Sequence, residues 1–208
     1  MTAPRLLAGE VRVRVGSVGV SALGMQAAGI IEGVGPDSAG FARNDRVAFR
    51  SLAPTTSVVV TVAERDLIGI PGDITLDAAA ALFPCAMLAR TVVRQVHAIG
   101  RGTHIAVTDV SVVAPFIVAW AEHLGATVQH REATTQAESA DVVVSGPSVR
   151  AALSMRPGHG SAQQAAADVF AAMRAGAFDD IPTSTADEAR QGSRSPVLLH
   201  PAEVSLAA

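Results

Sequence analysis

The sequence predicts an α/β protein in which short strands come first and a parallel sheet follows. Two runs in the first half, Glu10–Val15 and Arg46–Arg50, alternate in hydrophobicity, which is the pattern of half-buried strands. Between His104 and Val128 a strand, a helix and a second strand follow one another, an order typical of a parallel sheet. With 49% hydrophobic and 17% charged residues, the chain can bury the core of such a fold.

Two further strands complete the expected β-rich first half. Gly29–Gly35 is predicted to be a strand that closes in a turn at Gly35 and Pro36. Ser57–Ala63 is a continuous apolar run, which is typical of a strand covered on both faces. Short strands at this spacing predict a small barrel or sandwich.

Helical signals begin near residue 75. Thr75 is a suitable N-cap for a helix over Leu76–Leu82, because its hydroxyl can accept from a backbone N–H of the first turn. Pro84 is expected to interrupt that helix, since proline lacks the N–H that continues the hydrogen bonding. A second helix is predicted over Met87–Ile99, ended by Gly100.

The strand–helix–strand unit is the clearest signal in the chain. His104–Thr108 predicts a strand, and Pro115–Leu124 predicts a helix with proline in its first turn and Gly125 just beyond its end. Ala126 begins the next strand, so at least part of the chain is expected to form a parallel sheet. Three more elements are predicted: a strand over Asp141–Val144, a helix over Ala162–Gly176 and a closing strand over Pro196–Leu199.

Composition excludes several classes of protein. The net charge is −3 and aromatic residues are 3% of the chain, so neither a basic nor an aromatic surface for nucleic acid is expected. The absence of Lys and Tyr excludes a Schiff-base lysine and a tyrosine proton donor. The single cysteine, Cys85, excludes an internal disulfide and a cysteine-based zinc site, and the histidines lack metal-binding spacing.

Hydropathy gives an expectation about location. No apolar run reaches the ~18 residues needed to span a bilayer, and no signal-peptide core follows the N-terminus. We therefore expect a cytoplasmic protein with no membrane partner, no nucleic-acid partner and no bound metal.

Segments along most of the chain carry a family resemblance: Gly9–Val20, Ala27–Phe49, Ile74–Ala89, His123–Val128, Val169–Ala189 and Pro196–Leu199. They are similar to successive parts of the medium-chain dehydrogenase/reductase superfamily, in particular the enoylreductase domain of modular polyketide synthases, which resembles quinone oxidoreductases. The resemblance implies an α/β fold of reduced size, a β-barrel-like (GroES-like) domain plus a truncated Rossmann-like parallel sheet. It implies a first domain of residues 1–88 with 162–208 and a second of residues 89–161.

The chain departs from the family at the phosphate-binding turn. Where the family has a glycine-rich stretch, this chain has Ser111, Val112, Ala114 and Pro115, with Asp109 close by. Glycine lets the backbone approach a pyrophosphate, whereas the side chains of Val112 and Val113 fill that space. Proline has no N–H, and a carboxylate repels phosphates. The sequence therefore predicts that no cofactor is used. NADPH is the expected cofactor only under the alternative that the protein is a reductase with an atypical turn.

Four residues in segments that resemble the family's crevice are candidates for catalysis: Asp109, His104, Arg90 and Ser111. His104 is either a proton shuttle or a packed histidine, and Asp109 is either a general acid or base or a helix cap. Arg90 lies in an apolar run and needs a partner, which is an acid of this chain or a ligand oxygen. Ser111 either caps a helix or donates to a ligand.

Three functions stay open at this point. The first, which we favour, is a non-redox enzyme of polyketide biosynthesis, of cyclase or isomerase type, that holds the reacting atoms of an apolar polyketide-like substrate together. The second is an NADPH-dependent enoyl or quinone oxidoreductase with an atypical nucleotide turn, and the third is a non-catalytic partner of a polyketide synthase. Apolar surface uncovered by the missing segments predicts a homodimer.

Overall fold

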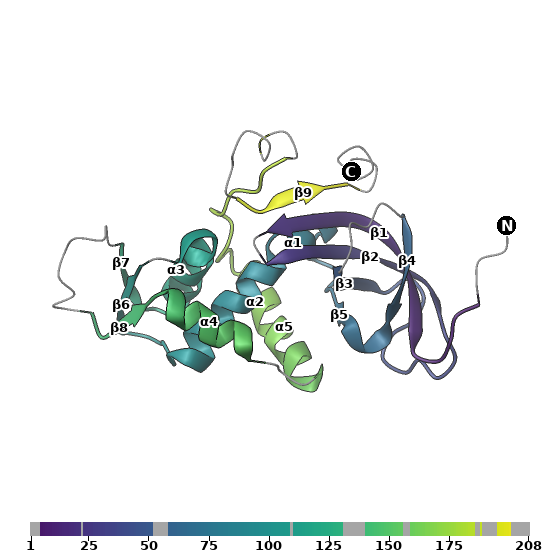
Figure 1. Cartoon of the computed structure of the whole chain (residues 1–208), viewed down its shortest axis with the longest axis horizontal. Coiled ribbons are helices and arrows are strands. Elements are labelled where there is room, and N and C mark those ends of the chain that lie inside the picture. The colour runs from purple at the N-terminus through teal and green to yellow at the C-terminus, as the bar shows by residue number, and fades with distance from the viewer. Residues whose placement is uncertain are drawn as a thin grey trace. The chain divides into compact units, whose positions relative to one another are not determined.

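A computed structural model describes residues 5–21, 23–51, 58–108, 110–130, 140–155, 159–185, 188 and 195–200. The chain divides into two compact units, one of Met1–Phe83 with Thr183–Ala208 and one of Pro84–Pro182. Figure 1 shows the helices and strands of each unit with the labels used below. Within the described ranges, no helix is long and apolar enough to cross a membrane.

The first unit is built on an antiparallel sheet of six strands. Its elements are β1 (Glu10–Ser21), β2 (Gly24–Val34), β3 (Arg46–Ser51), β4 (Val59–Ala63), the short 3-10 helix η1 (Glu64–Asp66), β5 (Leu67–Gly69), α1 (Leu76–Ala81) and β9 (Val197–Leu199). The strand order is β4-β1-β2-β3-β5, and β9 also pairs with β1. The chain therefore returns, after the second unit, to complete the sheet with which it began.

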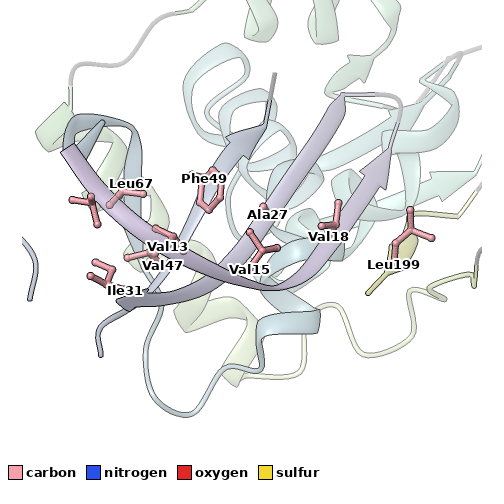
Figure 2. Packing of buried hydrophobic residues seen from close by; sticks show 10 residues of the cluster. Val13, Val15, Val18, Ala27, Ile31, Val47, Phe49, Leu67 and Leu199 are labelled. Atoms are coloured by element: carbon pink, nitrogen blue, oxygen red, sulfur yellow. The ribbon is translucent and has the colours of Figure 1, made fainter. Parts of the chain in front are cut away.

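The core of the first unit is formed by alternate residues of the long strands. Register shifts in β1 at Arg12/Val13 and at Val15/Ser17 mark irregular pairing, and bulges of this kind bend a strand. Figure 2 shows the side chains that gather there: Val11, Val13, Val15, Val18, Ala27, Ile31, Val47, Phe49, Leu67 and Leu199. The alternation predicted for the first strand is confirmed, because its valines are buried while its arginines are not.

Helix α1 begins where the sequence predicts. The hydroxyl of Thr75 accepts a hydrogen bond from the backbone N–H of Ala78 at 3.1 Å, which satisfies one of the first N–H groups of the helix. α1 ends at Ala81, and α2 (Phe83–Thr91) begins after one intervening residue. Pro84 thus stands in the first turn of a new helix, where its missing N–H costs nothing.

The packing of α1 on β1 depends on a glycine. A Cβ atom at Gly19 would lie far closer than 3.0 Å to the backbone of Ala80, so no side chain fits between strand and helix. The buried hydroxyl of Ser17 donates to the carboxylate of Asp77. These two contacts fix the helix against the strand that carries most of the core.

The apolar run predicted to be covered on both faces is instead an edge strand. β4 pairs with β1 at one end of the sheet order, and the side chains of Val58 and Val59 are 53% and 41% exposed. Ser57, the first residue of the predicted strand, lies outside the described ranges. The prediction of double coverage was wrong because exposure depends on the neighbouring strands and not on the apolar run itself.

The second unit holds a three-stranded parallel sheet with strand order β7-β6-β8. Its strands are β6 (His104–Val107), β7 (Thr127–His130) and β8 (Val142–Val144). Its helices are α2 (Phe83–Thr91, from Pro84 on), the π-helix η2 (Val92–Val96), the 3-10 helix η3 (Ser111–Val113), α3 (Ala114–His123), α4 (Gly146–Ser154) and α5 (His159–Arg174). The predicted strand–helix–strand unit is confirmed, because α3 joins two parallel neighbours.

Three aromatic side chains form the centre of the second unit. The ring of Phe178 lies 6.0 Å from that of Phe116 and 5.9 Å from that of Trp120, measured between centroids. The indole N–H of Trp120 donates to the carbonyl oxygen of Ala86 at 2.9 Å. Trp120 is 3% exposed, so it is a core residue, as its apolar neighbours predict.

One predicted helix and one predicted domain assignment differ from the structure. The helix predicted over Met87–Ile99 ends as an α-helix at Thr91 and continues as η2. The hydroxyl of Thr91 donates to the carbonyl of Met87 at 3.0 Å, and such side-chain bonds compete with regular helix geometry. The residues of α5 lie in the second unit, whereas the predicted boundary assigned residues 162–208 to the first.

Candidate functional site

The carboxyl edge of the parallel sheet is a topological switch point. From β6 the chain passes through α3 to β7 on one side, while β8 lies on the other side of β6. The backbone N–H of Thr108 donates to the carbonyl oxygen of Val144 at 2.9 Å, which joins the ends of β6 and β8. Ligands of open parallel sheets bind outside the carboxyl ends of the strands at such a point. This edge is therefore the candidate site.

On the β6 side of this edge, the chain enters η3 and then α3. Val110 and Val113 are buried, and the N–H of Val113 donates to the carbonyl of Val110 at 3.2 Å. Val112 is half-buried and Pro115 is exposed. The first N–H groups of a helical run have no acceptor within it, and the N-terminus carries a partial positive charge. The backbone of Ser111 and Val112 is thus placed to donate to an anion.

On the β8 side, α4 begins directly at the edge. Ser148 is buried in its first turn, and its hydroxyl oxygen accepts from the backbone N–H of Ser145 at 3.2 Å. The same oxygen lies 2.7 Å from Nε2 of His97, the residue at the end of η2. Burial lowers the pKa of His97 below its ordinary value, which favours the neutral imidazole. In the neutral tautomer with its proton on Nδ1, Nε2 accepts the Ser148 hydroxyl proton. A hydrogen-bonded chain thus runs from the sheet edge to η2.

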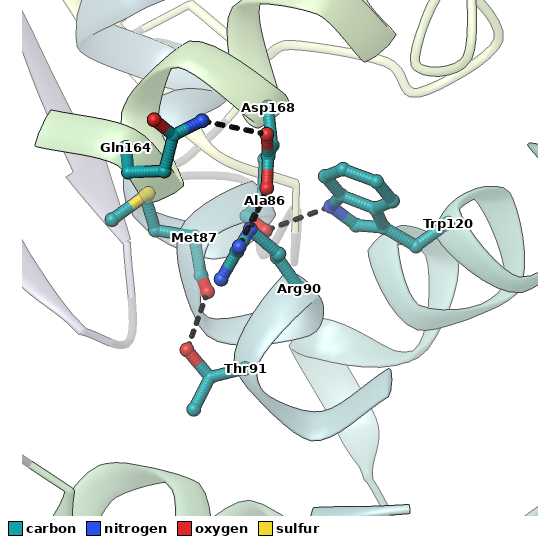
Figure 3. A network of polar contacts seen from close by, with 7 residues as sticks. All are labelled: Ala86, Met87, Arg90, Thr91, Trp120, Gln164 and Asp168. Atoms are coloured by element: carbon teal, nitrogen blue, oxygen red, sulfur yellow. Dashed lines mark hydrogen bonds and ion pairs between the residues drawn. The ribbon is translucent and has the colours of Figure 1, made fainter. Parts of the chain in front are cut away.

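Arg90 has an acid of this chain as its partner. Its Nε and Nη2 donate to the same oxygen of Asp168 at 2.9 and 2.5 Å, and the amide of Gln164 donates to the other oxygen at 3.5 Å (Figure 3). The Arg90 side chain is 12% exposed and that of Asp168 36%. Nη1 of Arg90 is buried with no acceptor among the described residues, which leaves its two N–H groups for a water or ligand oxygen. The pair ties α2 to α5.

Of the predicted catalytic residues, the structure places His104 and the backbone of Ser111 at opposite edges of the parallel sheet. His104 is exposed and begins β6, so it lies at the amino edge of the sheet, away from η3. Its backbone N–H donates to the carboxylate of Asp141 at 2.8 Å. The backbone of Ser111 stands at the carboxyl edge, and Asp109 lies outside the described residues. The catalytic roles of these residues stay predictions.

The donors at the candidate site are backbone N–H groups and hydroxyls. Over the part of the chain that the structure describes, no group of three or more His, Cys, Asp or Glu is placed to hold a metal ion. Cys85 is buried in α2, where it packs as a small apolar side chain. The edge is therefore suited to anions and polar organic groups.

Solved structures share the architecture of this chain, although no protein-family model and no curated protein matches its sequence. 2-Haloacrylate reductase matches with a TM-score of 0.74 and 20% identity over 97% of this chain and 94% of that chain. CurK enoyl reductase matches with a TM-score of 0.71 and 15% identity over 96% and 93%. The chain has the medium-chain dehydrogenase/reductase fold. The predicted fold class, an α/β fold with a β-barrel-like domain plus a truncated Rossmann-like parallel sheet, is confirmed by an antiparallel sheet and a separate parallel sheet of three strands.

One comparison overturns the prediction that no cofactor is used. The mycobacterial protein Rv1454c complexed with NADPH matches with a TM-score of 0.68 and 18% identity, over 97% of this chain and 94% of that chain. Rv1454c, which matches this chain over nearly its whole length, therefore binds NADPH with the same fold. The prediction took the amino acids of the turn alone as decisive, and that was its error.

The residues of the edge fit a dinucleotide better than the sequence suggests. One of the two valines expected to block the turn, Val113, is buried in the unit and does not line the edge. The helix N-termini of α3 and α4 both begin there, and their partial positive charges favour phosphate. The fit is weaker than at a glycine-rich turn, because Val113 uses its N–H internally and Pro115 has none.

Sequence reasoning missed α4 and the residues that hold its first turn. A signal was present, because Ser145 precedes Gly146 and Pro147, and serine followed by proline in the first turn is typical of a helix start. The contact between His97 and Ser148 joins residues 51 positions apart. Spacing alone carries no signal for such a pair.

Proposed function

We propose that this protein is an NADP(H)-dependent reductase of conjugated carbonyl compounds, of enoyl or quinone oxidoreductase type. The observation that carries the proposal is the meeting of the α3 and α4 N-termini at the switch point between β6 and β8. The NADPH complex of a protein with the same fold supports it. When bound, NADPH supplies a hydride for reduction of a polarised double bond.

The chain's own groups at the edge bind and orient the cofactor. The N–H groups of Ser111 and Val112 hold phosphate oxygens, helped by the dipole of α3. Thr108, Ser145 and the first turn of α4 line the edge beside them. The valines beneath, Val110 and Val113, are buried and keep the turn in place. The absence of Lys and Tyr leaves proton delivery to other groups or to water.

The matched reductases share a substrate class. A 2-haloacrylate, an enoyl group and a quinone each contain a carbon–carbon double bond conjugated to a carbonyl, and reductases of the first two match this fold. We infer that this chain acts on an apolar conjugated carbonyl compound. The homodimer that the sequence predicts also stays a proposal.

The test measures binding and turnover separately. NADPH is titrated by calorimetry and through the fluorescence of Trp120, the sole tryptophan, which lies on α3 below the edge. Oxidation of NADPH is then followed with an enoyl thioester, a haloacrylate and a quinone as acceptors. Saturable binding with acceptor-dependent oxidation supports the proposal. Lack of binding contradicts it.

Replacing Val112 by glycine is expected to strengthen NADPH binding by about threefold to tenfold, since ~1.4 kcal/mol corresponds to a factor of ten. The substitution clears a half-buried side chain from the turn and lets its N–H approach a phosphate. Val113→Gly is the matched control, and it is expected to lower stability without tightening binding, because Val113 is buried. Calorimetric titration measures the NADPH affinity of both variants. Equal or weaker binding by V112G would contradict the placement of the phosphates at η3.

A second candidate is a non-redox cyclase or isomerase of polyketide biosynthesis. The observation that favours it is the turn, where Ser111, Val112 and Ala114 replace the glycines of the family. This candidate predicts that NADPH is not consumed with any conjugated acceptor, whereas an unsaturated polyketide chain is rearranged. The turnover assay above therefore separates the two functions.

A further inference from the structure

The hydrogen bond between His97 and Ser148 connects a π-helix to the proposed cofactor edge. Nε2 of His97 lies 2.7 Å from the Ser148 hydroxyl oxygen, and that oxygen also accepts from the N–H of Ser145. Ser145 directly follows β8, whose last residue Val144 is bonded to Thr108 at the end of β6. The imidazole is thus two hydrogen bonds away from the carboxyl edge of the sheet.

The backbone on both sides of His97 has an unusual conformation. Five residues before it form η2, a π-helix, and single π-turns are rare and concentrate at functional sites. Ala98, the next residue, has a φ of 50°, a left-handed conformation that non-glycine residues seldom adopt. A regular α-helix through this segment would rotate the imidazole away from Ser148, because each residue turns the helix by about 100°.

We propose that His97 is a positioning residue for the cofactor edge, which holds the first turn of α4 in place through Ser148 while its imidazole is neutral. The inference rests on the proposed function. In the neutral tautomer with its proton on Nδ1, Nε2 accepts the Ser148 hydroxyl proton, and the Ser148 oxygen accepts the Ser145 N–H. The imidazole Nε2, the Ser148 hydroxyl and the Ser145 N–H are then all paired.

Protonation of His97 disrupts this arrangement. Nε2 becomes a donor, so the Ser148 hydroxyl proton loses its acceptor in a buried position. A positive imidazolium also stands beside the positive end of the α4 dipole. The other charged or titratable groups on the elements packed against His97 are Arg94 of η2, Arg150 of α4, and Glu122 and His123 of α3. All four are exposed, so solvent screens them.

The first experiment compares NADPH affinity at about pH 7.5 and about pH 5.5, either side of the ordinary histidine pKa. The phosphate of NADPH titrates in the same range, so the measured quantity is the difference between variants at each pH. His97→Gln places an amide oxygen near the position of Nε2 and cannot titrate. We expect H97Q to bind like the wild type at the higher pH and more tightly than the wild type at the lower pH, by less than about tenfold because burial lowers the pKa of His97. His123→Gln is the control and should follow the wild type.

Two further variants remove the contact itself. His97→Ala and Ser148→Ala are expected to weaken NADPH binding at the higher pH by about fivefold to tenfold, the range found when one hydrogen bond to a buried group is lost. H97Q keeps a hydrogen-bond acceptor at this position, whereas H97A does not. Wild-type NADPH affinity in H97Q together with weaker affinity in H97A would attribute the effect to the hydrogen bond and not to the bulk of the side chain. Binding by H97A equal to that of the wild type at both pH values overturns the inference.

A readout without cofactor completes the test. In the cofactor-free protein, amide exchange at Ser145, Gly146 and residue 148 should be faster in H97A and S148A than in H97Q. In the wild type, exchange at these positions should become faster relative to H97Q as the pH falls. Because the pKa of His97 is lowered in the folded protein, the unfolded chain binds more protons than the folded chain below about pH 6.5. The stability of the wild type relative to H97Q should therefore decrease as the pH decreases. Lack of NADPH binding by the wild type at every pH overturns the proposed function together with this inference. Binding and exchange that are identical in all variants overturn this inference alone.

Discussion

Replacing Gly19 by alanine is expected to reduce the free energy of unfolding of the first unit by about 3 kcal/mol or more, as forced overpacking does. The added Cβ would overlap the backbone of Ala80, and a backbone cannot rotate away as a side chain can. Helix α1 must therefore lift from β1, and the bond between Ser17 and Asp77 breaks with it. Urea titration followed by far-UV circular dichroism measures the loss.

Gly72→Ala is the control for this substitution. No heavy atom lies within 4 Å of a Cβ at Gly72, so its effect should stay within about 0.5 kcal/mol. A stability of G19A within that same margin of the wild type would show that α1 does not pack on β1 as described.

Replacing Asp168 by asparagine is expected to destabilise the second unit by about 2–4 kcal/mol, the consequence of leaving a buried charge without its counter-charge. The Arg90 side chain is 12% exposed and loses both charge-assisted bonds to Asp168. The magnitude is below that of a fully buried pair because Asp168 is 36% exposed. Unfolding in urea is followed through the fluorescence of Trp120, which lies in this unit.

Two comparisons test the reason for that loss. The double variant Arg90→Met with Asp168→Leu should recover most of the stability, since replacing a buried pair by apolar residues is often close to neutral. Glu32→Gln breaks the ion pair with Arg14, whose side chains are 36% and 55% exposed, and should cost less than about 1 kcal/mol. A D168N variant as stable as E32Q would mean that Arg90 is not held as a buried cation.

Much of the fold could be predicted from the sequence, because its elements depend on local patterns and not on contacts between distant residues. Alternation in β1, the Thr75 cap and the β6-α3-β7 unit were all predicted from neighbouring residues. These features are fixed by periodicity and by backbone hydrogen bonding, which a single sequence carries. The edge position of β4 was not predicted, because it depends on which strands pair with β1 and how they are ordered.

The site was predicted less well because its geometry is set by contacts between distant segments. Arg90 and Asp168 are 78 residues apart, and His97 and Ser148 are 51 apart. Whether Val113 lines the turn or packs inside depends on the 3-10 helix that precedes α3. The amino acids of the turn suggested a blocked phosphate site, but the direction of each side chain could not be derived from their identity alone.

The binding of NADPH at the carboxyl edge of the parallel sheet is the central claim, and amide chemical shifts measured during a titration with NADPH test it most directly. We expect saturable shift changes at Thr108, Ser111, Val112 and the first turn of α4, the groups that the fold places at the switch point. Residues at the amino edge, such as His104, should shift little. No saturable change, or changes confined to the first unit, would contradict the claim.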